Sequence, residues 1–229
     1  EANLNLFLNK DDVYVYAKEY FHPFNPTPLR GKPFIIVGPS GVGKNTLVQA
    51  ILKKYEGIFE KKVSYTTRQE KKHLKPGKNY QLISREEFEK VSFLSIYLMI
   101  SNSENITKDF VEHTEINGHY YGTCKKELQR INDAGRIPII EVDTAGAISI
   151  NRTGLEGNFL FVYPPSFEQL RKRIGNRIET EEEFKKRIEM AITEIELANN
   201  SVLFTNRLNN DVLEKATDQF YTLIDALYF

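Results

Sequence analysis

Short apolar runs bounded by turn residues recur along the chain. Runs of about four to eight such residues are typical of strands that are buried on both faces, as in a parallel sheet. We therefore expect strands at residues 34–37, 137–143, 158–163 and 202–205.

Between these runs, apolar residues recur at the spacing of an amphipathic helix. After the first strand they include Leu47, Ala50, Ile51 and Tyr55, and Gly57 ends that helix. A second helix is expected from Arg85, after the capping pair Ser84 and Glu87, and a third from Cys124 to about Ala134, ended by Gly135. Three more are expected: one after the cap Ser166, one that opens with the largely acidic segment 179–183, and one from Asp211 to Leu227. Strands that alternate with helices predict an α/β fold with three layers, a mostly parallel central sheet and right-handed crossovers.

Composition limits the partners. The 229 residues suffice for one α/β unit with insertions and a substantial core. Lys plus Arg and Asp plus Glu both number 31, so no overall field favours nucleic acid or an anionic membrane, and we expect neither as a partner. The single cysteine, Cys124, excludes an intramolecular disulfide and a multi-cysteine zinc site, and fits a reducing compartment.

The longest apolar run, residues 91–100, is about half of the roughly 20 residues that a membrane-spanning helix needs. The first residues contain no basic region of the kind that opens a signal peptide. We therefore expect a soluble, cytoplasmic protein, a monomer or a weak homo-oligomer. Residues 1–32, rich in aromatics and then in prolines, are expected to form an N-terminal extension or linker.

The most specific motif is Gly-Pro-Ser-Gly-Val-Gly-Lys at residues 38–44, between the first strand and the first helix. Its glycines let successive backbone amides point inward at an anion, and Lys44 adds a positive charge at the amino end of the helix. With a strand before it and a helix after it, this pattern is typical of a phosphate-binding loop. The next residue is usually Ser or Thr, whose hydroxyl binds magnesium, but here it is Asn45, followed by Thr46.

Two acidic residues, Glu141 and Asp143, stand at the carboxyl end of the expected strand at residues 137–143. Ligands of open α/β sheets bind at this edge. Near a phosphate loop, such carboxylates are candidates for binding magnesium and its waters. A simple strand-end cap is the alternative.

Two segments are rich in cations: residues 62–78, and the stretch that contains Arg171, Lys172, Arg173 and Arg177. Such segments are usually solvated surfaces. The first, however, follows the phosphate loop and has tyrosines interleaved, which favours a second anion site. The second lies between two expected helices and resembles a lid that closes over polyphosphate.

Taken in order, these motifs resemble one family, the guanylate kinases, which transfer the γ-phosphoryl group of ATP to GMP. The resemblance runs from about Pro33 to the C-terminus and includes Gly-Pro-Ser-Gly-Val-Gly-Lys, Val-Ser-Tyr-Thr-Thr-Arg, Gly-Lys-Asn-Tyr, Phe-Val-Glu-His, Tyr-Tyr-Gly-Thr, Glu-Val-Asp, Pro-Pro-Ser and Lys-Lys-Arg-Ile. It implies a three-layer P-loop fold with a small mixed GMP-binding part and a helical lid. The implied boundaries are a domain at 33–229, with its core at 33–60, 124–170 and 188–229, the GMP-binding part at 61–123 and the lid at about 171–187.

The resemblance implies how guanine would be read. Glu112 would accept from N1 and N2, and Ser64 and Thr123 would donate to O6. Adenine lacks this pattern, so a buried carboxylate left unpaired should discriminate strongly against it. Asp143 would lie on the guanine or ribose side.

The GMP phosphate would be held by Arg68, Tyr80 and Tyr121, with Lys71 where the family usually has a second arginine. Lysine keeps the charge but loses the bidentate fork, so we expect weaker or less oriented GMP binding. Deoxy-GMP is a further candidate acceptor.

On the ATP side, the resemblance assigns catalytic roles to Lys44 and to lid or lid-adjacent arginines. Glu141 would orient metal-bound water, and the amide oxygen of Asn45 would have to replace the missing hydroxyl at the metal. The catalytic residues implied are Lys44, Arg173, Arg177 and Arg187, and the ATP-binding residues are Gly38, Pro39, Ser40, Gly41, Val42, Gly43, Lys44, Asn45, Thr46 and Asn206, the last at the end of the final strand.

The chain departs from the family in two further ways. Between Arg177 and Arg187 it is one residue shorter than the family's lid. An insertion at about residues 89–109 carries the long apolar run and should either form an extra buried helix or cover a partner.

Two alternatives to an active guanylate kinase stay open. One is a catalytically silent guanylate-kinase-like module that binds phosphorylated peptides, although such modules generally lose the loop lysine and the lid arginines that are present here. The other is a P-loop kinase for another small acceptor.

Overall fold

The computed structural model describes residues 31–68, 80–89, 110–116, 118–175 and 180–229. Its large sheet has five parallel strands in the order β2-β7-β1-β8-β9. These strands are β1 (Phe34–Val37), β2 (Phe59–Lys61), β7 (Ile137–Val142), β8 (Asn158–Tyr163) and β9 (Asn206–Asn209). The expected parallel central sheet is confirmed.

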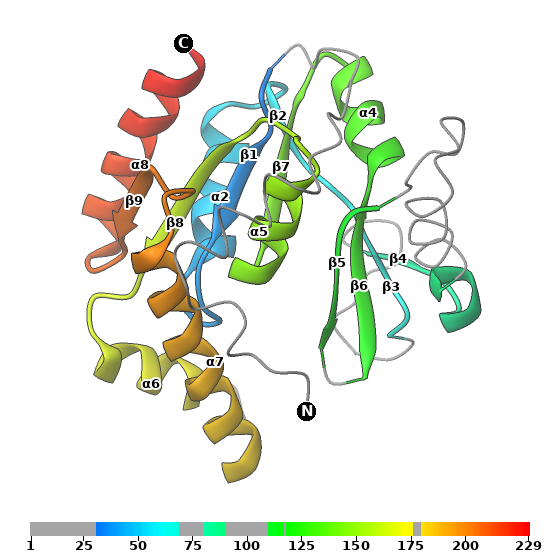
Figure 1. Ribbon diagram of the computed structural model, residues 1–229. Coiled ribbons are helices and arrows are strands. Elements are labelled where there is room, and N and C mark those ends of the chain that lie inside the picture. Colours follow the sequence, from blue (N-terminus) through cyan, green and yellow to red (C-terminus); the bar gives the residue numbers. More distant parts are fainter. Residues whose placement is uncertain (1–30, 69–79, 90–109, 117, 176–179) are drawn as a thin grey trace.

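Helices cover both faces of this sheet (Figure 1). They are α2 (Lys44–Lys54), α4 (Lys125–Asp133), α5 (Thr144–Arg152), α6 (Phe167–Gly175), α7 (Glu181–Asn200) and α8 (Leu213–Tyr228). Strand β1 divides the two cores, because successive side chains of a strand point to opposite faces. Phe34 and Ile36 pack with α2 and α8, whereas Ile35 and Val37 pack with residues of α4, α5 and α7. The result is the expected arrangement of three layers.

A second sheet lies beside the first and has the order β4-β3-β6-β5 (Figure 1). Its strands are β3 (Ser64–Thr66), β4 (Tyr80–Leu82), β5 (Phe110–Ile116) and β6 (His119–Cys124). Strands β3 and β4 are parallel and the other pairs antiparallel, so this sheet is mixed, as the resemblance implied. The register places Glu112 opposite Thr123 across β5 and β6.

Side-chain caps set the helix starts that the sequence predicted. The Glu87 amide donates to Ser84 Oγ at 3.0 Å, and the Ser84 amide donates to Glu87 Oε2 at 2.8 Å, which is the expected capping box. The Gln169 amide donates to Ser166 Oγ at 3.1 Å at the start of α6. The cap predictions at Ser84 and Ser166 are therefore confirmed.

The predicted last strand is wrong. Residues 202–205 form no strand, and β9 begins at Asn206, four residues beyond the expected start. Val202 is 83% exposed, whereas Leu203 and Phe204 pack into the core as part of a loop. Strand β9 itself pairs only with β8 and buries only Leu208 of its four residues. An edge strand with one inward side chain lacks the apolar run on which the prediction relied.

The expected extension at residues 1–32 and insertion at about 89–109 fall almost wholly outside the described residues and are not placed here. Within the part of the chain that is described, no helix is both long enough and apolar enough to cross a membrane.

Candidate active site

The glycine-rich loop connects β1 to α2 at the carboxyl edge of the large sheet. Gly41 and Gly43 have φ values of +84° and +103°, a conformation that favours glycine. A Cβ on Gly43 would lie 2.4 Å from Asn210 Nδ2, so this position has no room for a side chain. No side chain among the described residues caps the start of α2. The first amides of the helix are thus left to bind an anion.

Lys44 folds back over this loop. Its Nζ donates to the Gly38 carbonyl and, at 3.1 Å, to the Pro39 carbonyl. Burial lowers the pKa of Lys44, while the nearby carboxylates of Glu194, Glu141 and Asp143 oppose that shift. A phosphate would offer this ammonium stronger acceptors than two carbonyls do.

The carboxyl end of β7 contributes the two acidic residues. Glu141 Oε2 accepts from Lys61 Nζ at 2.7 Å, and the same ammonium donates to Asn45 Oδ1 at 3.4 Å. Asp143 Oδ1 accepts from the Gly146 amide at 2.7 Å and caps α5. Asp143 therefore acts as a cap in this structure, which was the alternative to binding magnesium. Glu141 and Asn45, by contrast, both accept from the Lys61 ammonium.

The expected base-reading residues converge in the small sheet. Thr123 Oγ1 donates to Glu112 Oε1, and Glu112 is only 6% exposed. Ser64, on β3, joins them through Lys62, whose Nζ donates to both Ser64 Oγ and Thr123 Oγ1. The sequence placed Lys62 only within a cation-rich run, so its position in this pocket is new.

Gly146 lies between the two sheets. A Cβ on Gly146 would lie 3.1 Å from Asp143 Oδ1 and 3.4 Å from Glu112 Oε2. The carboxylate of Asp143, at the edge of the large sheet, and that of Glu112, in the small sheet, therefore flank the first turn of α5. Glu112 and its partners therefore adjoin the edge of the large sheet that carries the phosphate loop.

Three residues expected at the GMP phosphate lie together. Arg68 Nη1 donates to the Tyr121 hydroxyl at 3.4 Å, and the Tyr80 and Tyr121 rings meet edge to face at 6.1 Å. Burial raises the pKa of Tyr80, so its hydroxyl stays a donor at neutral pH. Arg68 Nε is buried and has no hydrogen-bond partner among the described residues. Such an orphaned donor suits a bound anion. Lys71 lies outside the described residues.

Arginines of the expected lid approach the loop from α6 and α7, which pack against each other in the lower left of Figure 1. Arg187 Nη1 donates to Ser40 Oγ at 3.3 Å, and its Nη2 donates to Glu183 Oε1 at 3.1 Å. A Cβ on Gly41 would lie 3.7 Å from Arg173 Cβ, so α6 rests on the loop. Like Arg68, Arg187 has a buried Nε without a partner in the described part of the chain. Arg177 lies outside that part.

The expected position of Asn206 is wrong. It begins β9 instead of ending it, and its Nδ2 donates to the Phe159 carbonyl at 3.2 Å. It stands three positions before Asn209, so it lies roughly 10 Å short of the carboxyl end of the strand. The residue that follows β9 is Asn210, whose Nδ2 donates to the Val42 carbonyl at 2.7 Å. Asn210, missed by the sequence reasoning, contacts the phosphate loop.

Glu194, on α7, is a second residue that sequence reasoning missed. Burial, together with the Asp143 charge, raises the pKa of Glu194 to about 7, although Lys44 and Thr144 oppose the shift. Thr144 Oγ1 lies 3.5 Å from Glu194 Oε2. Its place in α7 offered no sequence signal, because an acidic residue on a helix is usually solvated.

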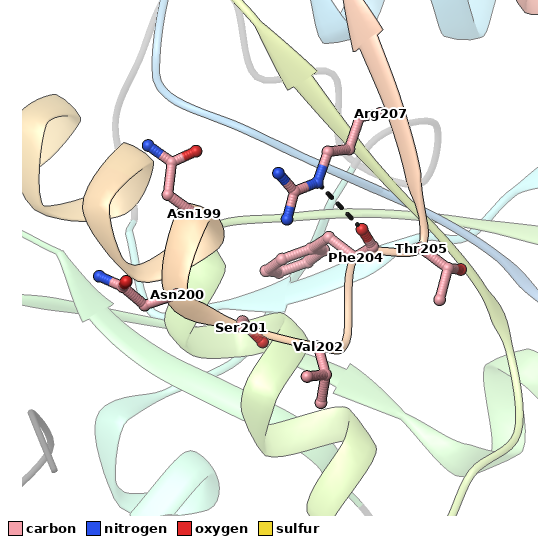
Figure 2. Close-up of a pocket in the computed structure, with 7 residues that line it drawn as sticks. All are labelled: Asn199, Asn200, Ser201, Val202, Phe204, Thr205 and Arg207. Atoms are coloured by element: carbon pink, nitrogen blue, oxygen red, sulfur yellow. Dashed lines mark hydrogen bonds between the residues drawn. The ribbon is translucent and has the colours of Figure 1, made fainter. Parts of the chain in front are cut away.

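A surface hollow lies away from this site, at the end of α7 (Figure 2). It has a volume of about 520 Å³ and is lined by Asn199, Asn200, Ser201, Val202, Phe204, Thr205 and Arg207. Arg207 Nε donates to the Phe204 carbonyl at 3.3 Å, so its charge is turned toward backbone acceptors. The hollow is lined by none of the residues that the sequence assigned to nucleotide binding or catalysis.

A phosphate loop at the carboxyl edge of a parallel sheet, with arginines of α6 and α7 beside it, defines a P-loop nucleotide-binding protein. The profile of the guanylate kinase family matches residues 30–227. The chain belongs to the guanylate kinase family.

Individual relatives support this family assignment. The chain is 34% identical to the guanylate kinase of Sus scrofa over 197 residues, which cover 86% of this chain and 91% of that protein. It is 34% identical to the guanylate kinase of Homo sapiens over 81% of this chain and 88% of that one. It is 36% identical to guanylate kinase 1 of Oryza sativa subsp. japonica over 84% of this chain, but this match spans only 47% of the rice protein.

Among solved structures, the chain resembles the crystal structure of guanylate kinase from Anaplasma phagocytophilum. The TM-score is 0.59 at 26% sequence identity, and the match covers 87% of both chains. This likeness agrees with the α/β fold described above.

Proposed function

We propose that this protein is an ATP:GMP phosphotransferase that converts ATP and GMP to ADP and GDP. The observation that carries the proposal is the junction at Gly146, where the carboxylates of Glu112 and Asp143 flank one helix turn. A buried carboxylate beside two hydroxyls matches the donors N1 and N2 and the acceptor O6 of guanine. The phosphate loop occupies the adjacent edge of the large sheet.

On the acceptor side, Arg68, Tyr80 and Tyr121 would bind the GMP phosphate, together with Lys71. Glu112 and Ser64 would contact the base, with Thr123 hydrogen-bonded to Glu112, and Asp143 would lie on the guanine or ribose side. The partnerless Nε of Arg68 supports an anion at this point. Deoxy-GMP is proposed as a further acceptor, since none of these roles involves the 2′-hydroxyl.

On the donor side, the loop amides and Lys44 would hold the β- and γ-phosphates of ATP. Arg173, Arg177 and Arg187 would neutralise charge on the transferring group. Phosphoryl transfer depends on in-line positioning and charge neutralisation, so no protein nucleophile is required. Closure of the lid, at about residues 171–187, onto the core and the GMP-binding part would exclude water as a competing acceptor.

A magnesium ion would be bound with ATP. Asn45 Oδ1 and Glu141 Oε2 already share one cation, the Lys61 ammonium, so their oxygens fit a cation site. Glu141 would bind the ion through a water molecule, and the amide oxygen of Asn45 would bind it directly or lie next to it. Held there, Mg²⁺ would supply positive charge that neutralises the phosphates of ATP.

Three further statements remain predictions. The first is the division of the domain at 33–229 into a core at 33–60, 124–170 and 188–229, a GMP-binding part at 61–123 and a lid at about 171–187. A cytoplasmic location rests on the presence of a single cysteine, Cys124, which is buried. A monomer or weak homo-oligomer is expected.

The test is ATP consumption in a coupled assay with GMP, AMP, CMP or no acceptor, with and without Mg²⁺. Turnover confined to GMP and abolished by chelation would support the proposal. Equal turnover with another monophosphate would favour a P-loop kinase for a different acceptor. No turnover, with GMP still protecting the fold against heat, would favour a silent binding module.

A further inference from the structure

Lys62 is a buried lysine within the base-reading site. It follows β2 and precedes β3, and its amide donates to the Ile139 carbonyl at 3.1 Å, which fixes its backbone to β7. Its side chain is only 3% exposed. A lysine is rarely buried to this extent without paired partners, because removing an ammonium from water is costly.

The partners of Lys62 are the three residues expected to read guanine. Its Nζ donates to Ser64 Oγ at 2.7 Å and to Thr123 Oγ1 at 2.5 Å, and lies 3.8 Å from Glu112 Oε1. Burial lowers the pKa of Lys62, and the charge of Glu112 opposes this shift. The four side chains thus form one buried polar cluster.

The protons in this cluster can be assigned. An ammonium has three donors and no acceptor, whereas a hydroxyl has one donor. Thr123 accepts from Lys62 and donates its own proton to Glu112, so that proton is not available to a base. Ser64 also accepts from Lys62, which leaves its hydroxyl proton free to donate elsewhere.

We propose that Lys62 is a specificity-determining residue that makes one end of the base pocket positive and donor-rich, and so selects a purine with an oxygen at position 6. Ser64 O–H and the remaining Lys62 N–H face this oxygen, and Thr123 positions Glu112. Glu112, 3.8 Å from the ammonium, accepts from N1 and N2. A 6-amino purine would instead turn its own donors toward the Lys62 charge.

This inference rests on the proposed function, and its test separates the position-6 oxygen from the rest of the base. The two substrates are GMP and 6-thioguanosine 5′-monophosphate, which keeps N1–H and the 2-amino group but has sulfur, a weak acceptor, in place of the oxygen at position 6. The two variants are Lys62→Met, which keeps the length of the side chain and removes the charge, and Lys126→Met, a control at an exposed position of α4.

Lys62→Met should lower kcat/KM for GMP by roughly 10- to 100-fold, the usual effect of losing a hydrogen bond to a charged group. The analogue should be affected much less, so the GMP-to-analogue ratio should fall at least about tenfold. Lys126→Met should leave the ratio unchanged. If Lys62 had only a structural role, its loss would lower kcat/KM for both substrates in proportion. An unchanged GMP-to-analogue ratio of kcat/KM in the Lys62→Met enzyme would therefore overturn the inference.

Lys62→Gln provides a second variant if the methionine variant does not fold, because glutamine keeps a donor without the charge. Its GMP-to-analogue ratio should lie between those of the wild type and Lys62→Met, and a ratio equal to that of the wild type counts against the role of the charge. Failure of the proposed function would be seen separately, as wild-type protein that does not phosphorylate GMP. A failure of this inference alone leaves an active wild-type enzyme whose selectivity does not depend on Lys62.

Discussion

The ammonium of Lys61 lies 2.7 Å from Glu141 Oε2, in an ion pair whose side chains are 30% and 23% exposed. The same Nζ reaches Asn45 Oδ1 at 3.4 Å. Lys61 therefore occupies the acceptors that we assign to the magnesium site, and a divalent ion has to compete with it.

The first prediction concerns this competition. Lys61→Met should lower the free Mg²⁺ concentration that gives half-maximal rate by about two- to fivefold, as expected from the loss of a partly exposed ion pair. Initial rates at fixed ATP and varied free Mg²⁺ measure this shift, and thermal protection by MnATP gives a readout independent of turnover. A half-maximal concentration that rises or stays constant would show that Lys61 does not compete with the metal.

The second prediction concerns base reading by Glu112. Glu112→Gln replaces one acceptor with a donor, so kcat/KM for GMP should fall by roughly 10²- to 10⁴-fold, as at other sites built to hydrogen-bond their substrate. Glu115→Gln, on the same strand but exposed, is the matched control. Steady-state kinetics with GMP test the pair. Similar kcat/KM values for the two variants would show that Glu112 does not contact the base.

The third prediction is a pH dependence from Glu194, whose folded pKa of about 7 lies above the ordinary value of 4.5. The folded state then binds this proton more tightly than the unfolded state. The contribution of Glu194 to the free energy of unfolding is therefore greatest at low pH and is lost as pH rises from about 4.5 to about 7.

Glu194→Gln should remove this loss. Its stability relative to wild type should grow between pH 4.5 and pH 8, reaching about 1 to 3 kcal/mol at the upper end. Urea unfolding at several pH values measures the difference. Glu189→Gln, at an exposed position of α7, should show no such trend. A difference that shrinks with rising pH would contradict the assignment.

The fourth prediction tests the fit between the phosphate loop and Asn210. Gly43→Ala places a Cβ 2.4 Å from Asn210 Nδ2 at a φ of +103°, so both clash and backbone strain oppose it. We expect a loss of roughly 2 to 4 kcal/mol of unfolding free energy. Gly57→Ala is the matched control, because its φ is +79° but nothing lies within 4 Å of the added atom.

The Gly57→Ala control should cost only about 1 kcal/mol, the strain of a left-handed alanine. Adding Asn210→Ala to Gly43→Ala should recover part of the loss, since it removes the contacting atom. Equal losses for Gly43→Ala and Gly57→Ala would show that the contact with Asn210 contributes nothing.

The sequence alone determined the features that depend on neighbouring residues. The glycines and Lys44 of the loop, the capping pair Ser84 and Glu87, and the buried runs of β1 and β8 each carry their signal within a few positions. Family resemblance added Glu112, Ser64 and Thr123, which the structure brings together. The capping pair and the two buried strands were predicted correctly because local geometry and patterning decide them.

Only the tertiary structure decided which distant residues meet. Lys62 contacts Thr123 across 61 positions, and Asn210 contacts Val42 across 168. The last strand was misplaced because β9 lies at the edge of the sheet and buries a single residue, so its pairing with β8 sets its position. A polar side chain in a charged run looks solvated from the sequence alone, and only packing shows that Lys62 is buried against Ser64, Thr123 and Glu112.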